Sequence, residues 1–291
     1  QTRISQVAQT LSQTLGADKS TVKAAGSLIK ADLVSDLVGE FPELQGIAGR
    51  HYALHDSASE AVANAIEQHY WPKFSGDKLP HSPESAALAL ADRLDTLIGI
   101  FGIGQLPTGS KDPFALRRAS LAVIRILLAF APTANLEMIL TTAKQSFPSG
   151  VLDEGVIDTV KAYLLDRLPA HYEEQGVSVD ILRSVTAVGT ETIGDIDCRS
   201  LAVTSFAGSD AANALAAANK RVANILTKVD ETLPAIDEQL LSERAELALR
   251  AALTESQASL DAAVANNDYP QALSNLAKLR EPVDALSLIH I

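Results

Sequence analysis

The sequence has very little sulfur and few aromatic side chains. Cys198 is the only cysteine and Met138 the only methionine among 291 residues, and Phe, Trp and Tyr make up 4% of the chain. A single cysteine excludes a disulfide framework and a cysteine-based zinc site, and it fits a reducing, cytoplasmic setting. With so few aromatics, the core must be built mainly from Leu, Ala, Val and Ile, a composition that suits helices.

The sequence also lacks a long apolar run and an excess of positive charge. No stretch of about 18 apolar residues is present, so we expect no membrane partner. The formal net charge of −12 argues against a general binder of nucleic acid, and we expect no DNA partner, because phosphate contacts need basic residues. A local basic stripe can still bind RNA on an acidic protein, so the distribution of charge matters more than its sum.

Helical periodicity runs through most of the chain, whereas strand-like alternation does not persist. Amphipathic spacing begins directly after Gln1 with no signal peptide, as expected of a piece of a longer protein. Asp18 or Ser20 can cap the second helix. Further helices are expected at 59–70, 82–98, 112–129, 136–146, 154–175, 209–230, 238–266 and 269–285. The sequence therefore predicts an all-α protein in two parts, with a less periodic boundary at 184–207.

The stretch 99–118 is rich in glycine and proline and partly matches a phosphate-binding loop. Gly104 and Gly109 have the spacing of a P-loop, but Ser110 and Lys111 follow in the reverse order. The residues before the stretch form a helical pattern, whereas a P-loop needs a strand there before its amides can hold phosphate. The pattern therefore favours a tight turn between two helices over a nucleotide-binding loop.

One histidine-rich segment allows a metal site. His51 and His55 are four residues apart, which places them on one face of a helix, and Asp56 follows as a third ligand. Together with Asp92 these residues would form the ligand set of a metal-dependent phosphohydrolase, which is one functional alternative. The other interpretation is a polar turn in which His55 and Asp56 hydrogen-bond locally.

The wider spacing resembles the layout of the HD phosphohydrolase fold, whose metal ligands are His and Asp residues from successive helices. In that register Arg3 and Lys30 stand at histidine positions, and only His69 and one of Asp92 or Asp95 remain. Permanent cations do not ligate a divalent metal; they repel it and pair with carboxylates instead. The layout therefore predicts that the helical scaffold is kept and the metal site is lost.

Two clusters of basic residues are candidates for RNA contacts. On the helix that begins at Ser209, Lys220, Asn224 and Lys228 follow one another at every fourth position, with Arg221 beside them. Amides next to cations suit bases as well as phosphates, although a solvated helix face gives the same pattern. The second cluster consists of Lys111, Arg117, Arg118 and Arg125. It opens a helix whose N-terminus would also favour phosphate.

Long motifs in a constant order resemble the β subunit of bacterial heterotetrameric glycyl-tRNA synthetase. The motifs are Lys30–Leu33, Val38–Gly49, His51–Ala53, Ala89–Gly104, Pro107–Arg118, Ala216–Leu226 and Leu279–Ala285. The resemblance covers almost the whole chain. The sequence departs from the family because the large N-terminal region before Gln1 is absent, and because 286–291 replaces the family's closing helices.

The resemblance implies a division of labour. Residues 1–200 would form an HD-like helical domain with a degenerate metal site, and residues 201–291 a truncated helical-bundle anticodon-binding domain. The implied partners are tRNA(Gly) and the catalytic alpha subunit, in an α2β2 assembly. ATP and Mg²⁺ would act at the alpha subunit, so this chain alone would be inactive, with no catalytic residue, metal or cofactor of its own. The basic clusters would contact tRNA. The remaining alternative is a helical scaffold that only binds the alpha subunit.

Overall fold

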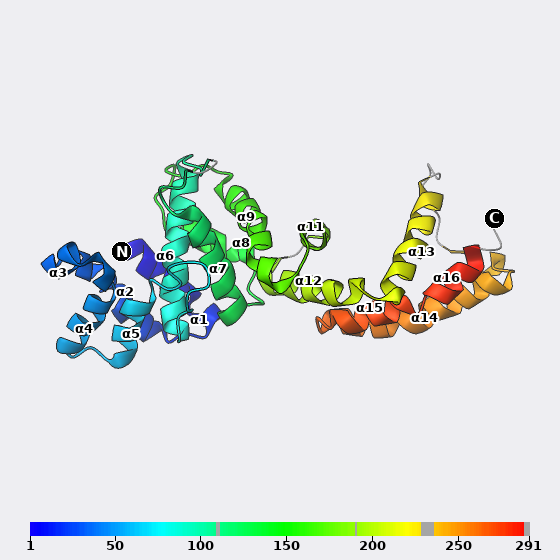
Figure 1. Cartoon of the computed structure of the whole chain (residues 1–291), viewed down its shortest axis with the longest axis horizontal. Coiled ribbons are helices and arrows are strands. Elements are labelled where there is room, and N and C mark those ends of the chain that lie inside the picture. The colour runs from blue at the N-terminus through cyan, green and yellow to red at the C-terminus, as the bar shows by residue number, and fades with distance from the viewer. Residues whose placement is uncertain (109–110, 190, 228–235, 288–291) are drawn as a thin grey trace. The chain divides into compact units, whose positions relative to one another are not determined.

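The computed structural model describes residues 1–108, 111–189, 191–227 and 236–287, and nearly all of their regular structure is helical (Figure 1). These ranges contain no β-strand, only two isolated β-bridges. The all-α prediction is therefore confirmed. Among the described helices, none is long and apolar enough to cross a membrane.

The chain divides into two compact units. Unit 1 comprises 1–175 and 186–195, and unit 2 comprises 176–185 and 196–291. The segment 184–207, expected as a less periodic boundary, is mostly helical, because α11 (Val179–Ala187) and α12 (Ile193–Ala207) cover most of it. The division into an HD-like and an anticodon-binding domain at residue 200 stays a prediction.

Unit 1 consists of α-helices joined by short 3₁₀ turns and loops. Its first elements are α1 (Thr2–Leu15), α2 (Lys19–Gly26), η1 (Ala31–Val34), α3 (Asp36–Glu40), η2 (Pro42–Leu44), α4 (Ile47–His55) and α5 (Glu60–Gln68). They are followed by α6 (Pro83–Gly102), α7 (Leu116–Phe130), α8 (Leu136–Lys144), α9 (Val156–Asp166), α10 (Leu168–Tyr172) and η3 (Glu173–Gln175).

Helix α6 is the centre of unit 1. It packs against α1, α2, α5, α7, α8 and α9. Leu90, Leu94, Leu97 and Ile98 are fully buried, and so is the small-residue face that includes Ala87. A helix that is apolar on nearly all sides belongs inside a protein, and each buried Leu contributes about 1.5–3 kcal/mol of transfer free energy. Polar residues on α6 are therefore held within a packed environment.

Side-chain caps mark several helix starts, and the cap at Asp18 is one that the sequence predicts. The Asp18 carboxylate accepts the amides of Ser20 and Thr21, and their hydroxyls also donate to it, which lowers the pKa of Asp18. Ser59 begins α5 and Ser82 begins α6 in the same way. These caps satisfy amides that have no partner within their own helix.

In unit 1, the limits of two helices differ from the expected ones for reasons that the structure shows. Helix α7 starts at Leu116 rather than at Asp112, because the Asp112 carboxylate accepts the amides of Leu116 at 2.8 Å and Arg117 at 3.0 Å. The helix expected over 154–175 is interrupted between α9 and α10, since Pro169 has no amide hydrogen to continue the ladder.

Unit 2 is also helical. In addition to most of α11 and α12, it contains α13 (Asp210–Leu226), η4 (Glu238–Leu240), α14 (Arg244–Ala265), α15 (Tyr269–Ala277) and α16 (Arg280–Ser287). Helices α15 and α16 pack against both α13 and α14. Helix α14 begins later than expected, at a capping box between Glu243 and Glu246. The side chains of Leu247 on α14 and of Val222 and Leu226 on α13 are exposed.

Candidate functional site

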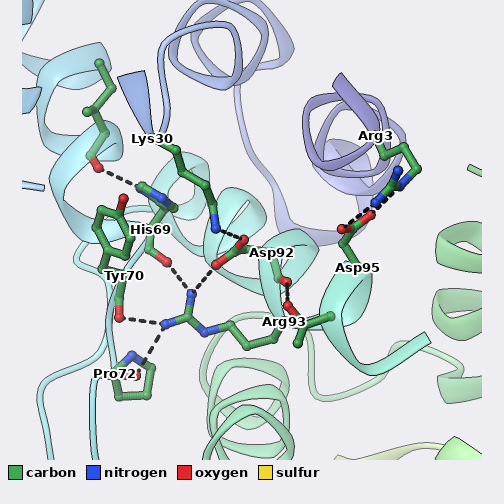
Figure 2. Close-up of polar contacts among 10 residues, drawn as sticks. Arg3, Lys30, His69, Tyr70, Pro72, Asp92, Arg93 and Asp95 are labelled. Atoms are coloured by element: carbon green, nitrogen blue, oxygen red, sulfur yellow. Dashed lines mark hydrogen bonds and ion pairs between the residues drawn. The ribbon is translucent and has the colours of Figure 1, made fainter. Parts of the chain in front are cut away.

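A cluster of charged side chains lies against α6 in unit 1. The Lys30 ammonium is 2.6 Å from Oδ1 of Asp92, and the Arg93 guanidinium is 3.2 Å from Oδ2 of the same carboxylate. Figure 2 shows Lys30 reaching Asp92 from a separate segment of the chain, whereas Arg93 follows Asp92 on α6. Lys30 has a φ of 61°, in the left-handed region that non-glycine residues seldom adopt. The Asp92 side chain is only 13% exposed, so the two cations supply the charge that its burial requires.

A second ion pair joins α1 to α6. Arg3 donates from Nε at 2.7 Å and from a terminal nitrogen at 3.0 Å to the two oxygens of Asp95 (Figure 2). Its guanidinium also lies 4.4 Å from the centre of the Phe147 ring. Arg3 and Lys30 therefore pair with carboxylates of α6, as the sequence predicts for cations at metal-ligand positions.

His69 is fully buried beside this cluster. Its Nδ1 lies 2.6 Å from the Ile66 carbonyl oxygen, so Nδ1 carries the proton and donates. Burial lowers the pKa of His69 to about 4, and the charges of Lys30 and Arg93 act in the same direction. The Asp92 charge and the Ile66 hydrogen bond oppose this shift without cancelling it. His69 is therefore neutral at pH 7, and its buried Nε2 has no hydrogen-bond partner among the residues that the structure describes.

Arginines from α6 and α7 hold the loop that follows α5. Arg93 donates to the carbonyls of His69, Tyr70 and Pro72, the last two at 2.6 and 3.3 Å (Figure 2). On α7, Arg118 donates to the Lys73 carbonyl at 3.2 Å. Arg125 reaches the Asp77 carbonyl at 2.6 Å. These side chains satisfy backbone acceptors that regular secondary structure leaves unpaired.

The alternative metal-ligand residues do not come together. His51, His55 and Asp56 lie at α4, where His55 Nδ1 is 3.2 Å from Asp56 Oδ1 and both side chains are more than 80% exposed. Asp92 instead belongs to the charged cluster on α6. Across the described ranges, no three His, Cys, Asp or Glu side chains are grouped so that they could hold a metal. The local interpretation, a hydrogen-bonded polar turn, describes His55 and Asp56.

A pocket of about 560 Å³ opens beside the charged cluster. It is lined by Pro42, Glu43, Gln45, Tyr70, Pro72, Lys73, Asp92, Arg93, Thr96, Phe114, Ala115, Arg118 and Ala119. All of these residues belong to unit 1. The pocket therefore combines an apolar wall with cationic groups at the position where the resemblance places a degenerate metal site.

The basic cluster of unit 1 consists of Lys111, Arg117, Arg118 and Arg125, and only part of it is exposed for contacts with RNA. Lys111 is exposed, whereas Arg117 is half-buried, and Arg118 is exposed but donates to a loop carbonyl. The start of α7, expected to favour phosphate, already gives two amides to Asp112. The Asp112 carboxylate therefore competes with any external anion for these amides, and the phosphate contact stays a prediction.

The second-unit basic cluster lies on α13. Lys220 and Asn224 are exposed one helical turn apart. Arg221 is also exposed, but its guanidinium pairs with Asp284 of α16. Lys228 lies outside the described residues. The structure therefore brings Lys220 and Asn224 to one surface and ties Arg221 to a neighbouring helix.

Sequence reasoning missed the part played by two buried charged residues. Arg93 occupies the apolar face of α6, between Leu90 and Leu97, and a cation at such a position needs buried acceptors. Asp32 is 3% exposed, and its Oδ2 accepts the Gly46 amide at 2.6 Å. Arg93 could have been recognised from its place in the apolar pattern, whereas Asp32 depends on a contact distant in sequence.

Known proteins match this chain over most of its length. The family described as Glycyl-tRNA synthetase beta subunit matches residues 1–187. The chain is 46% identical over 284 residues to the Glycine-tRNA ligase beta subunit of Janthinobacterium sp. (strain Marseille), which covers 97% of this chain and 40% of that protein. It is 47% identical over 284 residues to the protein of the same name from Photobacterium profundum, with 97% and 41% covered.

These matches define a component of an aminoacyl-tRNA synthetase. The chain belongs to the glycyl-tRNA synthetase beta subunit family. It spans about 40% of the length of the curated relatives that it matches.

Proposed function

We propose that this chain contributes tRNA recognition to a glycine–tRNA ligase whose chemistry takes place on a separate alpha subunit. Its membership of the beta subunit family is the observation that carries the proposal. The partners are tRNA(Gly) and the alpha subunit in an α2β2 assembly, and the site of action is the cytoplasm. ATP and Mg²⁺ act at the alpha subunit, where glycine is activated and transferred.

The charged cluster of unit 1 supports a non-catalytic role. Lys30 and Arg3 place fixed positive charge on Asp92 and Asp95, the carboxylates that a divalent metal would otherwise use. A metal at this position would have to displace two short ion pairs. The cluster therefore stabilises the helical scaffold and does not support hydrolysis.

The RNA contact is proposed for the exposed face of α13. Lys220 supplies a cation for a backbone phosphate, and Asn224 supplies an amide that can donate to or accept from a base edge. Lys228 continues the same spacing in the sequence. Lys111 in unit 1 is a second exposed cation for the same partner. These groups give an acidic protein a local positive surface.

Filter binding of tRNA(Gly) at about 50 mM and about 200 mM salt tests the proposal. We expect measurable affinity that falls with salt and that decreases in Lys220→Ala and Asn224→Ala. Lys23→Ala is the matched control, because Lys23 is an exposed lysine on α2 of unit 1. An absence of binding at the lower salt would contradict tRNA recognition and favour a scaffold that only contacts the alpha subunit.

Two further measurements test the division of labour. Aminoacylation assays with this chain alone should show no charging of tRNA(Gly), and charging without the alpha subunit would contradict the proposal. Elemental analysis of the purified chain should show no stoichiometric transition metal. A bound metal would instead favour the phosphohydrolase alternative.

A further inference from the structure

The pocket beside the charged cluster has a size and a lining that suit a nucleotide. Its volume of about 560 Å³ lies within the range of about 300–1,000 Å³ that is usual for small-molecule sites. Phe114, with 43% of its surface exposed, lines the pocket together with Pro42 and Pro72. An exposed aromatic ring offers a stacking surface for a base.

The same lining also carries positive charge. Lys73 and Arg118 are exposed, and Arg93 lies deeper with its guanidinium fixed by three backbone carbonyls. Burial lowers the pKa of Arg93, and the nearby charge of Arg118 contributes to this shift. Asp92 is already paired with Lys30 and Arg93, so it does not offset the cations at the mouth. A phosphate would relieve the repulsion between these cations.

The lining also contains one buried polar group, at Tyr70, and one exposed acceptor that a sugar or a base edge can reach, at Glu43. The Tyr70 hydroxyl is shielded from water and lies near Gln45 without a hydrogen bond of good geometry. Burial raises the pKa of Tyr70 to about 12, so the hydroxyl keeps its proton and can donate. Glu43 is an exposed acceptor at the same pocket.

We propose that this pocket holds one unpaired nucleotide of the bound RNA, with its base on Phe114 and its phosphate between Lys73 and Arg118. The proposal rests on the tRNA recognition proposed above and adds a second contact, in unit 1, to the contact on α13. The nucleotide is bound without cleavage, because the Lys30 ammonium occupies the position at Asp92 that a catalytic metal would need.

Isothermal titration of the 291-residue chain with adenosine 5′-monophosphate (AMP), adenosine and inorganic phosphate tests the site. We expect AMP to bind more tightly than either part alone, because the base and the phosphate contact different residues. Lys73→Ala and Phe114→Ala should each weaken AMP binding by about tenfold. Lys23→Ala and Met138→Ala are the controls, and Met138 has the same 43% exposure as Phe114. Thermal melts verify that each variant is folded.

Filter binding of tRNA(Gly) to the same variants shows whether the pocket binds a nucleotide within RNA or only a free nucleotide. Weaker tRNA binding by Lys73→Ala and Phe114→Ala, together with competition by AMP, supports the proposal. AMP that binds no better than phosphate overturns it, as does full tRNA affinity in both pocket variants. If tRNA binding depends on Lys220 but not on the pocket, the function proposed for α13 stands and this inference fails. If AMP binds in the pocket but tRNA does not bind at all, the function proposed above fails, and so does the assignment of the nucleotide to RNA.

Discussion

The Lys30 ammonium lies 2.6 Å from Oδ1 of Asp92 and joins the turn after α2 to the buried helix α6. The lysine backbone is held in the left-handed region at a φ of 61°, a conformation that costs a non-glycine residue about 1 kcal/mol or more. The packing around α6 and this ion pair keep the residue in place. The Lys30–Asp92 ion pair lies at a position where the HD-like layout would otherwise hold a metal.

Removing the Lys30 charge should destabilise unit 1. Lys30→Met keeps the length of the side chain but leaves the largely buried Asp92 with Arg93 as its only cation. We expect a loss of about 1–2 kcal/mol in the free energy of unfolding, less than for a fully buried pair because Lys30 is 33% exposed. Urea unfolding of Lys30→Met and of the parent chain measures this loss in the free energy of unfolding. A Lys30→Met, Asp92→Asn double variant should lose less than the sum of the single changes, and strict additivity would contradict the coupling.

The buried His69 should make the protein less stable in mild acid. Its folded pKa is about 4, below the usual pKa of 6.5 expected in the unfolded chain. The unfolded chain therefore takes up the proton first, and stability falls as the pH drops from 6.5 to 4, by up to about 3 kcal/mol. Urea unfolding at several pH values measures this slope.

His69→Phe is the matched variant for this pH dependence, because it keeps a buried ring without a titrating group. It should be less stable at pH 7, since the Ile66 carbonyl loses its donor, but its stability should change less between pH 6.5 and 4. A slope equal to that of the parent chain would show that other groups cause the acid sensitivity.

The arginines that hold the loop after α5 should differ in importance. Arg93→Met leaves three carbonyls of the loop without their donor and should cost about 3 kcal/mol or more. Arg118→Met removes one exposed bond of 3.2 Å and should cost about 1 kcal/mol or less. Limited proteolysis of the loop provides a second readout. Equal losses in the two variants would contradict the role assigned to Arg93.

Releasing Arg221 should strengthen tRNA binding. Asp284 pairs with Arg221 and also lies 3.7 Å from Arg280, so Asp284→Asn frees cations near Lys220. We expect tRNA(Gly) affinity to rise about two- to fivefold at low salt. Asp261→Asn is the control, because Asp261 is an exposed carboxylate on α14. An equal gain in both variants would mean that net charge alone is responsible.

The sequence predicted what depends on local patterns and on residue chemistry. Helix α1, the Asp18 cap and the pairing of Arg3 and Lys30 with carboxylates are confirmed. Each follows from periodicity, from capping preference or from the permanent charge of the cation. The metal-ligand alternative could not be settled from spacing, because spacing does not show that Asp92 lies apart from the residues at α4.

Contacts between distant residues account for two of the differences between the sequence predictions and the structure. Arg118 donates to a carbonyl 45 residues away, and no local pattern predicts that acceptor. The pairing of Arg221 with Asp284 spans 63 residues and likewise changes how free the basic cluster is. The late start of α7 is a local effect that was missed, because Asp112 serves the helix as a capping carboxylate rather than as its first residue.

The salt dependence of tRNA(Gly) binding tests the central claim most directly. The logarithm of the affinity should fall linearly with the logarithm of the salt concentration, and the slope should decrease by about one in Lys220→Ala, as expected for one lost phosphate contact. Lys23→Ala should keep the slope of the parent chain. Binding that is absent at low salt, or a slope that Lys220→Ala leaves unchanged, would contradict RNA recognition by α13.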